Sequence, residues 1–100
     1  MKVITELIKL EISKLHPNKW NPNSMPEGTF KKMLLSIKKF GLFHTIIVRE
    51  INKEYEIIDG EQRYKAFKAL GYIEISSKII EASDEEVKQM IFATTIKGRH

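Results

Sequence analysis

A glycine separates an apolar run from a group of polar and charged side chains near the middle of the chain. The segment reads Ile57, Ile58, Asp59, Gly60, Glu61, Gln62, Arg63. This order predicts a buried strand that turns at Gly60 and continues directly as a helix. The first N–H groups of a helix have no partner within it, and the helix dipole makes that end positive. The turn at 60–63 is therefore predicted to bind an anion, and phosphate is the common one.

The side chains of this segment suit such a site. Gly60 permits a backbone angle, or a close approach, that a side chain would block. Arg63 adds a forked donor that matches phosphate oxygens. Asp59 and Glu61 carry carboxylates that can hold Mg²⁺ or accept a proton. They are the candidate catalytic residues, and Glu61 is the candidate metal ligand.

The same residues also fit an interpretation without a ligand, since short glycine motifs match by chance. Glu61 suits a helix start electrostatically with no further role. Asp59 can be a turn residue that hydrogen-bonds its own backbone. A cation in the first helical turn is disfavoured by the dipole, so Arg63 needs an anion nearby. That anion is either a ligand or a carboxylate such as Asp59.

Two more segments join this one in a recognisable order. Residues 15–23 read LHPNKWNPN, residues 36–49 read SIKKFGLFHTIIVR, and residues 60–71 read GEQRYKAFKALG. They resemble the motifs L-x-P-N-x-x-x-P-R, S-I-x-x-x-G-L-x-Q-P-I-x-V-R and G-E-R-R-x-R-A…A-G. These motifs belong to the ParB N-terminal domain of the ParB/sulfiredoxin superfamily, and the resemblance spans roughly residues 10–90.

The resemblance implies a small α+β (mixed α/β) domain with a mixed sheet packed against helices. It also implies a nucleoside triphosphate with Mg²⁺, which is CTP in ParB proteins and ATP in other members. The nucleotide- and phosphate-binding residues it implies are Gly41, His44, Gly60, Glu61, Gln62 and Arg63. ParB dimers close around DNA, so we expect a role in DNA partition or regulation. A second copy of the chain is an expected partner, and DNA is expected through additional modules.

Several positions depart from the family pattern and keep other functions open. Sulfiredoxin has its catalytic cysteine where Glu61 stands, and this chain has no cysteine, so sulfiredoxin activity is excluded because it needs a thiolate. His44 replaces the usual Gln, and Gln62 replaces the first Arg of G-E-R-R. The later E-N-x-x-R box would fall at residues 94–98, where none of its three signature residues is present.

Two alternatives to a nucleotide-binding module follow. Asp59 replaces a small residue, and D-G-x-x-R resembles the serine-kinase and phage-borne branches of the superfamily. A phosphotransferase or weak NTPase would use Asp59 or Glu61 as its base. A structural or interaction domain that has lost its ligand would explain the missing E-N-x-x-R box.

Composition limits the remaining classes. The chain has 100 residues, 42% of them hydrophobic, which predicts one domain over 1–100 with one modest core and no helix-turn-helix module. No apolar stretch is long enough to span a membrane. The charged N-terminus lacks a signal-peptide core and cysteine is absent, so we expect a cytoplasmic protein. The net charge of +4 favours an anionic partner.

Periodicity predicts the elements that position these residues. Strands are expected near 6–12, 45–50, 54–58 and 74–80, with 45–58 as a hairpin, and helices near 26–39 and 61–70. Gly41 should end the first helix in a left-handed conformation. The buried face of that helix should hold Phe30, Met33, Leu34, Ile37 and Phe40.

A last helix should begin with a capping box at Ser83 and Glu86. Its end is polar, so we expect it to pack against a second copy or to fray. Arg49 and Trp20 are interpreted as structural residues.

Overall fold

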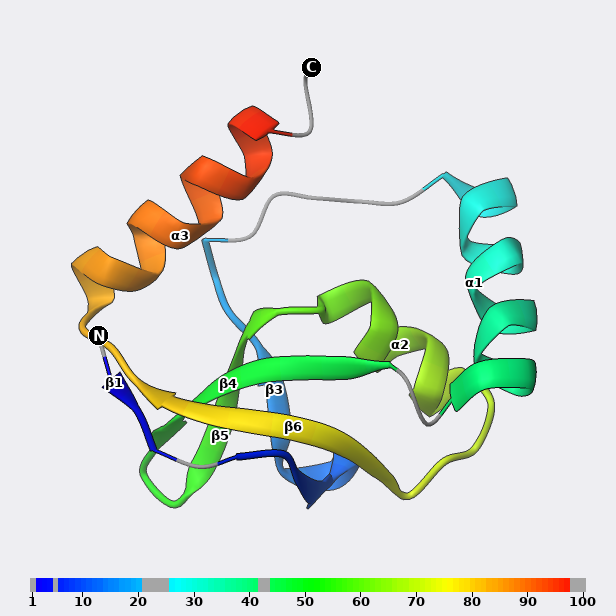
Figure 1. Ribbon diagram of the computed structural model, residues 1–100, viewed down its shortest axis with the longest axis horizontal. Coiled ribbons are helices and arrows are strands. Elements are labelled where there is room, and N and C mark those ends of the chain that lie inside the picture. The colour runs from blue at the N-terminus through cyan, green and yellow to red at the C-terminus, as the bar shows by residue number, and fades with distance from the viewer. Residues whose placement is uncertain (1, 5, 21–25, 42–43, 98–100) are drawn as a thin grey trace.

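The computed structural model describes residues 2–4, 6–20, 26–41 and 44–97 (Figure 1). Within these ranges the strands are β1 (Lys2–Val3), β2 (Ile8–Glu11), β3 (Leu15–Pro17), β4 (Thr45–Ile51), β5 (Glu54–Asp59) and β6 (Glu74–Glu81). The helices are α1 (Glu27–Phe40), α2 (Glu61–Ala69) and α3 (Asp84–Lys97), and a 3-10 turn covers Ile12–Lys14. The four predicted strands and three predicted helices are all present.

The strands form one mixed sheet in the order β1-β6-β4-β5-β3, with β2 also paired to β6. The pairs β4–β6 and β3–β5 are parallel, and the other pairs are antiparallel. The predicted hairpin is confirmed: β4 and β5 are joined through Asn52 and Lys53, both with positive φ. Such a two-residue turn matches the twist of the strands. The α+β prediction is therefore confirmed.

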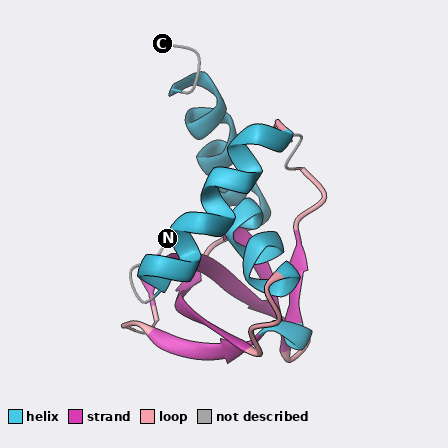
Figure 2. Ribbon diagram, turned by 90° about the vertical axis from the view of Figure 1, so that its right-hand side faces the viewer, coloured by secondary structure: helices cyan, strands magenta, loops and turns pink. Residues whose placement is uncertain are grey.

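Neighbouring residues of β4 and β5 contribute side chains to two separate hydrophobic clusters. Ile46 and Ile57 belong to a cluster covered by α1 and α2. Ile47 and Ile58 belong to a cluster with Val87 and Ile91 of α3. Successive side chains of a strand point to opposite faces, so α2 and α3 pack on different faces of the sheet. Figure 2 shows the helices concentrated toward one end of the molecule and the strands toward the other.

The end of α1 differs from the prediction. Gly41 has φ −54° and ψ −30°, which is right-handed and not the expected left-handed cap. Phe40 is exposed, whereas Ile37 is fully buried. The reason is that α1 packs mainly on α2, so only the middle of its apolar face meets the core. Phe30, Met33 and Leu34 are half-buried at that contact.

The start of α3 follows the sequence prediction. The backbone N–H of Ser83 donates to Glu86 Oε1 at 3.0 Å, and the backbone N–H of Glu86 donates to Ser83 Oγ at 3.2 Å. Val87 and Ile91 are buried, while Phe92 is exposed. Figure 1 shows the far end of α3 projecting away from the strands. Whether that end contacts a second copy stays a prediction, and residues 98–100 lie outside the described part.

Arg49 is a buried structural residue, as expected. Its guanidinium donates to Glu56 Oε1 at 2.9 Å, to the Ala82 carbonyl oxygen at 3.0 Å and to Asp84 Oδ1 at 2.8 Å. Trp20 packs against the hydrophobic cluster that contains Val87 and Ile91. The centre of its ring lies 5.9 Å from Arg49 Cζ. No helix in the described residues is long and apolar enough to cross a membrane.

Candidate functional site

Gly60 connects β5 directly to α2 in a conformation that requires glycine. Its φ is 102° and its ψ is 24°, in the left-handed region. A β-carbon at this position would lie 2.6 Å from Ile46 Cγ2 and 3.3 Å from Ile46 Cα. Ile46 is fully buried in β4, so it has no room to move aside. Both predicted reasons for a glycine, backbone angle and close approach, apply here.

The hydrogen-bond ladder of α2 begins after this turn. The first bond runs from the Tyr64 N–H to the Gly60 carbonyl oxygen at 2.9 Å, and no side chain at Gly60 caps the helix. The N–H groups of residues 61–63 precede the ladder, where helix geometry directs donors toward an outside acceptor. The turn thus has the geometry of a helix-start anion site.

A β-bulge precedes the turn. Val48 of β4 pairs with Ile57, and the preceding residue Ile47 pairs with Asp59, so Ile58 is an additional residue in β5. A bulge bends its strand and redirects the side chains that follow. Here it sets the direction in which Asp59 leaves the sheet beside Gly60.

Arg63 is held by two groups next to the turn. Its Nη1 donates to the Thr45 carbonyl oxygen at 3.0 Å and lies 3.7 Å from Asp59 Oδ2. The side chains of Arg63 and Asp59 are 40% and 48% exposed. Asp59 therefore supplies an anion for this cation, while the exposed part of the guanidinium can meet a ligand. The structure brings together Asp59, Gly60 and Arg63, as the sequence predicted.

Glu61 lies below the surface of the same turn. It is only 8% exposed, and its Oε2 lies 3.5 Å from Lys65 Nζ, one helical turn later. The described residues contain no group of three His, Asp or Glu side chains that could hold a metal ion. A magnesium ion at Glu61 would therefore need further oxygen ligands, which the phosphates of a nucleotide supply. Gln62 is half-buried beside it.

His44 is linked to α1 and α2. Its Nε2 lies 3.2 Å from Ser36 Oγ, and its ring meets the Phe67 ring edge-on at 6.5 Å. The backbone N–H of His44 donates to the Gly41 carbonyl oxygen. The following residue, Thr45, accepts the hydrogen bond from Arg63. His44 is thus one residue away from the hydrogen bond that Thr45 makes to Arg63 at the 60–63 turn.

Gly41 lies apart from that turn. A β-carbon at Gly41 would meet the Tyr72 hydroxyl at 3.4 Å, and the residue lines a cavity with Tyr72. Sequence reasoning did not identify Ser36 and Thr45 as site neighbours. Their adjacency to named motif residues was the available signal: Ser36 opens the S-I-x-x-x-G segment and Thr45 follows His44 directly.

Comparison with known proteins identifies the family of this chain. The family profile described as "ParB N-terminal domain" matches residues 2–96. The chain belongs to this family. A probable chromosome-partitioning protein ParB from Coxiella burnetii is 32% identical over 97 residues, covering 96% of this chain and 33% of the relative. A nucleoid occlusion protein from Oceanobacillus iheyensis is 32% identical over 84 residues, covering 81% and 29%. The chain thus spans about a third of the length of these relatives.

Solved structures show the same fold. A C-terminally truncated ParB from Caulobacter crescentus, complexed with CTP-gamma-S, matches with a TM-score of 0.82 at 23% identity and covers 93% of this chain and 54% of its own. Sulfiredoxin from Arabidopsis thaliana matches with a TM-score of 0.71 at 25% identity and covers 87% and 98%. The ParB N-terminal domain therefore retains the ParB/sulfiredoxin fold in this chain, as the sequence predicted.

Proposed function

We propose that this domain is a ParB-like nucleotide-binding module that takes a nucleoside triphosphate with Mg²⁺ at the 60–63 turn. The observation that carries the proposal is the left-handed Gly60, packed on Ile46, which opens α2 beside a half-exposed Arg63. A helix start and a guanidinium together supply N–H donors and positive charge where phosphate oxygens need them.

The phosphates would take the place that Asp59 now fills for Arg63. Arg63 Nη1 would still donate to the Thr45 carbonyl oxygen, 3.0 Å away. This hydrogen bond would keep the guanidinium oriented while its other N–H groups donate to phosphate. Backbone N–H groups of residues 61–63 complete the anion site. Glu61 would hold Mg²⁺ together with phosphate oxygens.

The sugar and base would lie toward α1. The His44 ring and the Ser36 hydroxyl lie 3.2 Å apart, and Thr45, which holds Arg63, follows His44 directly. Gln62 contributes from the first turn of α2. Gly41 follows α1, and its carbonyl oxygen accepts the hydrogen bond from the His44 backbone N–H. CTP is the first nucleotide to test, because the Caulobacter crescentus ParB structure that shares the fold contains CTP-gamma-S.

The biological role proposed for the module is DNA partition or regulation, from the names of its relatives. Residues 1–100 would act as one nucleotide-binding domain without a helix-turn-helix module. DNA would be bound through additional modules, and a second copy would pack against α3 when nucleotide is present.

Calorimetric titration with CTP, ATP, ADP and GTP, each with and without Mg²⁺, tests this function. We expect triphosphate binding that Mg²⁺ strengthens and that Arg63→Ala weakens by more than the ~1 kcal/mol of an ordinary hydrogen bond. A domain that binds none of them at millimolar concentration would instead be a structural or interaction domain.

Product analysis in the same samples tests the enzymatic alternative. Asp59 is half-exposed at the end of β5 and 3.7 Å from Arg63, so its carboxylate can reach a reacting group beside a bound phosphate. An NTPase would convert the triphosphate to a nucleoside diphosphate and free phosphate, and a phosphotransferase would form the same nucleoside diphosphate while moving the phosphate to an added hydroxyl acceptor such as serine. Asp59→Asn should stop formation of the nucleoside diphosphate while leaving binding in place.

A further inference from the structure

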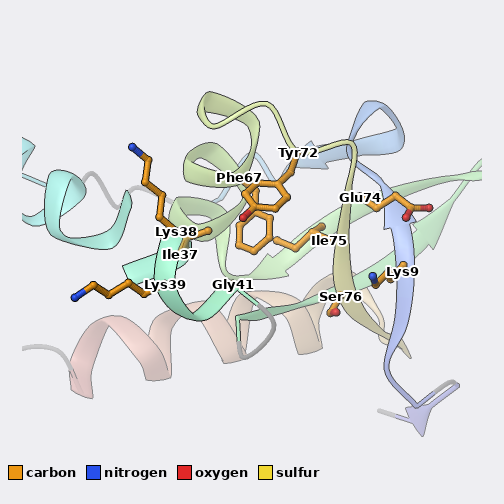
Figure 3. A pocket seen from close by; sticks show the side chains of 10 residues that line it. All are labelled: Lys9, Ile37, Lys38, Lys39, Gly41, Phe67, Tyr72, Glu74, Ile75 and Ser76. Carbon is orange, nitrogen blue, oxygen red and sulfur yellow. The ribbon is translucent and has the colours of Figure 1, made fainter. Parts of the chain in front are cut away.

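A cavity of about 250 Å³ lies between the ends of α1 and α2 and the beginning of β6 (Figure 3). Ile37 and Gly41 border it from α1, Phe67 and Tyr72 from α2 and the segment after it, and Ile75 from β6. The rings of Phe67 and Tyr72 are tilted at 44° with centroids 4.7 Å apart. The floor is thus apolar and partly aromatic.

Charged side chains surround this floor on two sides. Figure 3 shows Lys38 and Lys39 extending from α1 on one side, and Lys9 with Glu74 on the other. The two α1 lysines reach outward beside the cavity and not across it. The rim therefore offers positive charge to groups that flank an occupant, while the cavity itself accepts an apolar group.

The cavity is distinct from the 60–63 turn, although it adjoins the His44 side of the proposed nucleotide site, where the Phe67 ring meets the His44 ring. Of the residues proposed for nucleotide binding, Gly41 alone lines it. Phe67 lies one helical turn beyond Arg63, and Tyr72 lies past the end of α2. The volume is also below the ~300–1,000 Å³ of pockets that enclose a drug-sized ligand. It suits one or two side chains inserted from a larger partner.

Two sequence neighbours of the lining residues are exposed apolar side chains. Phe40 follows Lys39 at the end of α1, and Ile73 follows Tyr72; both are exposed, Ile73 by 77%. Aromatic and aliphatic side chains around a pocket, with lysines at its rim, form the kind of surface that receives an anchor residue flanked by opposite charge.

We propose that this cavity is a docking site for an acidic peptide segment that inserts an apolar anchor between Phe67, Tyr72 and Ile75. Acidic residues before and after the anchor pair with Lys38 and Lys39 on one side and Lys9 on the other. The rim carries three lysines and one glutamate, Glu74. This excess of positive charge favours an acidic partner. The proposal does not depend on nucleotide binding.

The test uses the full chain, ¹⁵N-labelled, and the peptide Glu-Asp-Glu-Leu-Phe-Glu-Asp-Glu as the probe. We expect amide shifts at Gly41, Tyr72, Ile75 and Ser76, and none at residues 60–63. Replacing Leu-Phe of the probe by Gly-Gly keeps its charge and should weaken binding about tenfold or more. Equal binding of the two peptides, or shifts confined to residues 60–63, would overturn the proposal.

Charge-reversal variants give the matched control. Lys38→Glu with Lys39→Glu should weaken the probe about tenfold, because two flanking attractions become repulsions. Lys31→Glu with Lys32→Glu makes the same charge change on α1, away from the cavity, and should alter affinity less than twofold. Equal losses from both pairs would show binding by net charge alone and contradict the docking site. Arg63→Ala should retain the peptide even where it loses nucleotide.

Discussion

The backbone of Gly60 lies so close to the side chain of Ile46 that a β-carbon at position 60 would stand 2.6 Å from Ile46 Cγ2. Ile46 belongs to the main core, and the residue before it, Thr45, accepts the hydrogen bond from Arg63. Two adjacent residues of β4 therefore position the turn: Ile46 packs against Gly60, and Thr45 orients Arg63. The site and the core share this contact, so the turn cannot be changed without a cost in stability.

Gly60→Ala should destabilise the domain by about 2–4 kcal/mol, measured by urea unfolding. Alanine in the left-handed region costs about 1–2 kcal/mol, and the contact with Ile46 adds an overpacking penalty. An unchanged unfolding midpoint would show that the turn relaxes without strain.

Substitutions at two other glycines separate the cost of the left-handed backbone from the cost of the contact with Ile46. Gly71 has φ 84° with nothing within 4 Å of a built β-carbon, so Gly71→Ala should cost only the backbone term of about 1 kcal/mol. Gly28 lies in α1 with open space around it, and Gly28→Ala should leave stability unchanged or slightly raised.

Arg49→Ala should cost about 3–5 kcal/mol, because it leaves the largely buried Glu56 without its partner. It should also raise amide hydrogen exchange at the start of α3, which Arg49 ties to the sheet through Ala82 and Asp84. Asp84→Asn should cost less than about 1 kcal/mol, since Asp84 is mostly exposed. Similar losses from both variants would contradict this account of Arg49.

Ser83→Ala should destabilise α3 by about 1 kcal/mol, because it removes the acceptor for the Glu86 N–H. Ser83→Asp keeps an acceptor at the same position and should restore most of that loss. Amide exchange of residues 84–88 is the measurement. Protection in Ser83→Ala equal to that of the unaltered chain would show that the capping box contributes little.

The elements found from the sequence are those with local signals. The hairpin, the strand–Gly60–helix connection and the Ser83 capping box each depend on neighbouring residues, and all three are present. Those signals act within a few residues, so they require no knowledge of the rest of the fold.

The features that were missed depend on distant partners. β3 pairs in parallel with β5, about 40 residues away, and its residues His16 and Pro17 do not read as a strand. The bulge at Ile58 depends on the register against β4. Phe40 fits the helical period of the buried face of α1 but is exposed to solvent. Gly41 ends α1 without a left-handed angle, because several backbone conformations can end a helix.

Glu61→Gln should reduce only the Mg²⁺-dependent part of nucleotide binding, because the amide keeps the shape of the side chain but not its charge. Lys65→Met is the control, since it removes the partner that lies 3.5 Å from Glu61 and leaves the carboxylate in place. Calorimetry with and without Mg²⁺ separates the two parts. Equal loss in both conditions would make Glu61 a residue of the fold and not a metal contact.

An NMR titration of the ¹⁵N-labelled chain with CTP and Mg²⁺ tests whether the 60–63 turn binds phosphate. We expect the largest amide shifts at residues 61–63 and a strong loss of those shifts in Arg63→Ala. The fold of that variant should be preserved, because Arg63 is half-exposed. Arg63→Lys keeps the charge without the fork and should bind with intermediate affinity. Unchanged amides at residues 61–63 at millimolar CTP, or equal binding by Arg63→Ala, would contradict the assignment of this turn as a phosphate site.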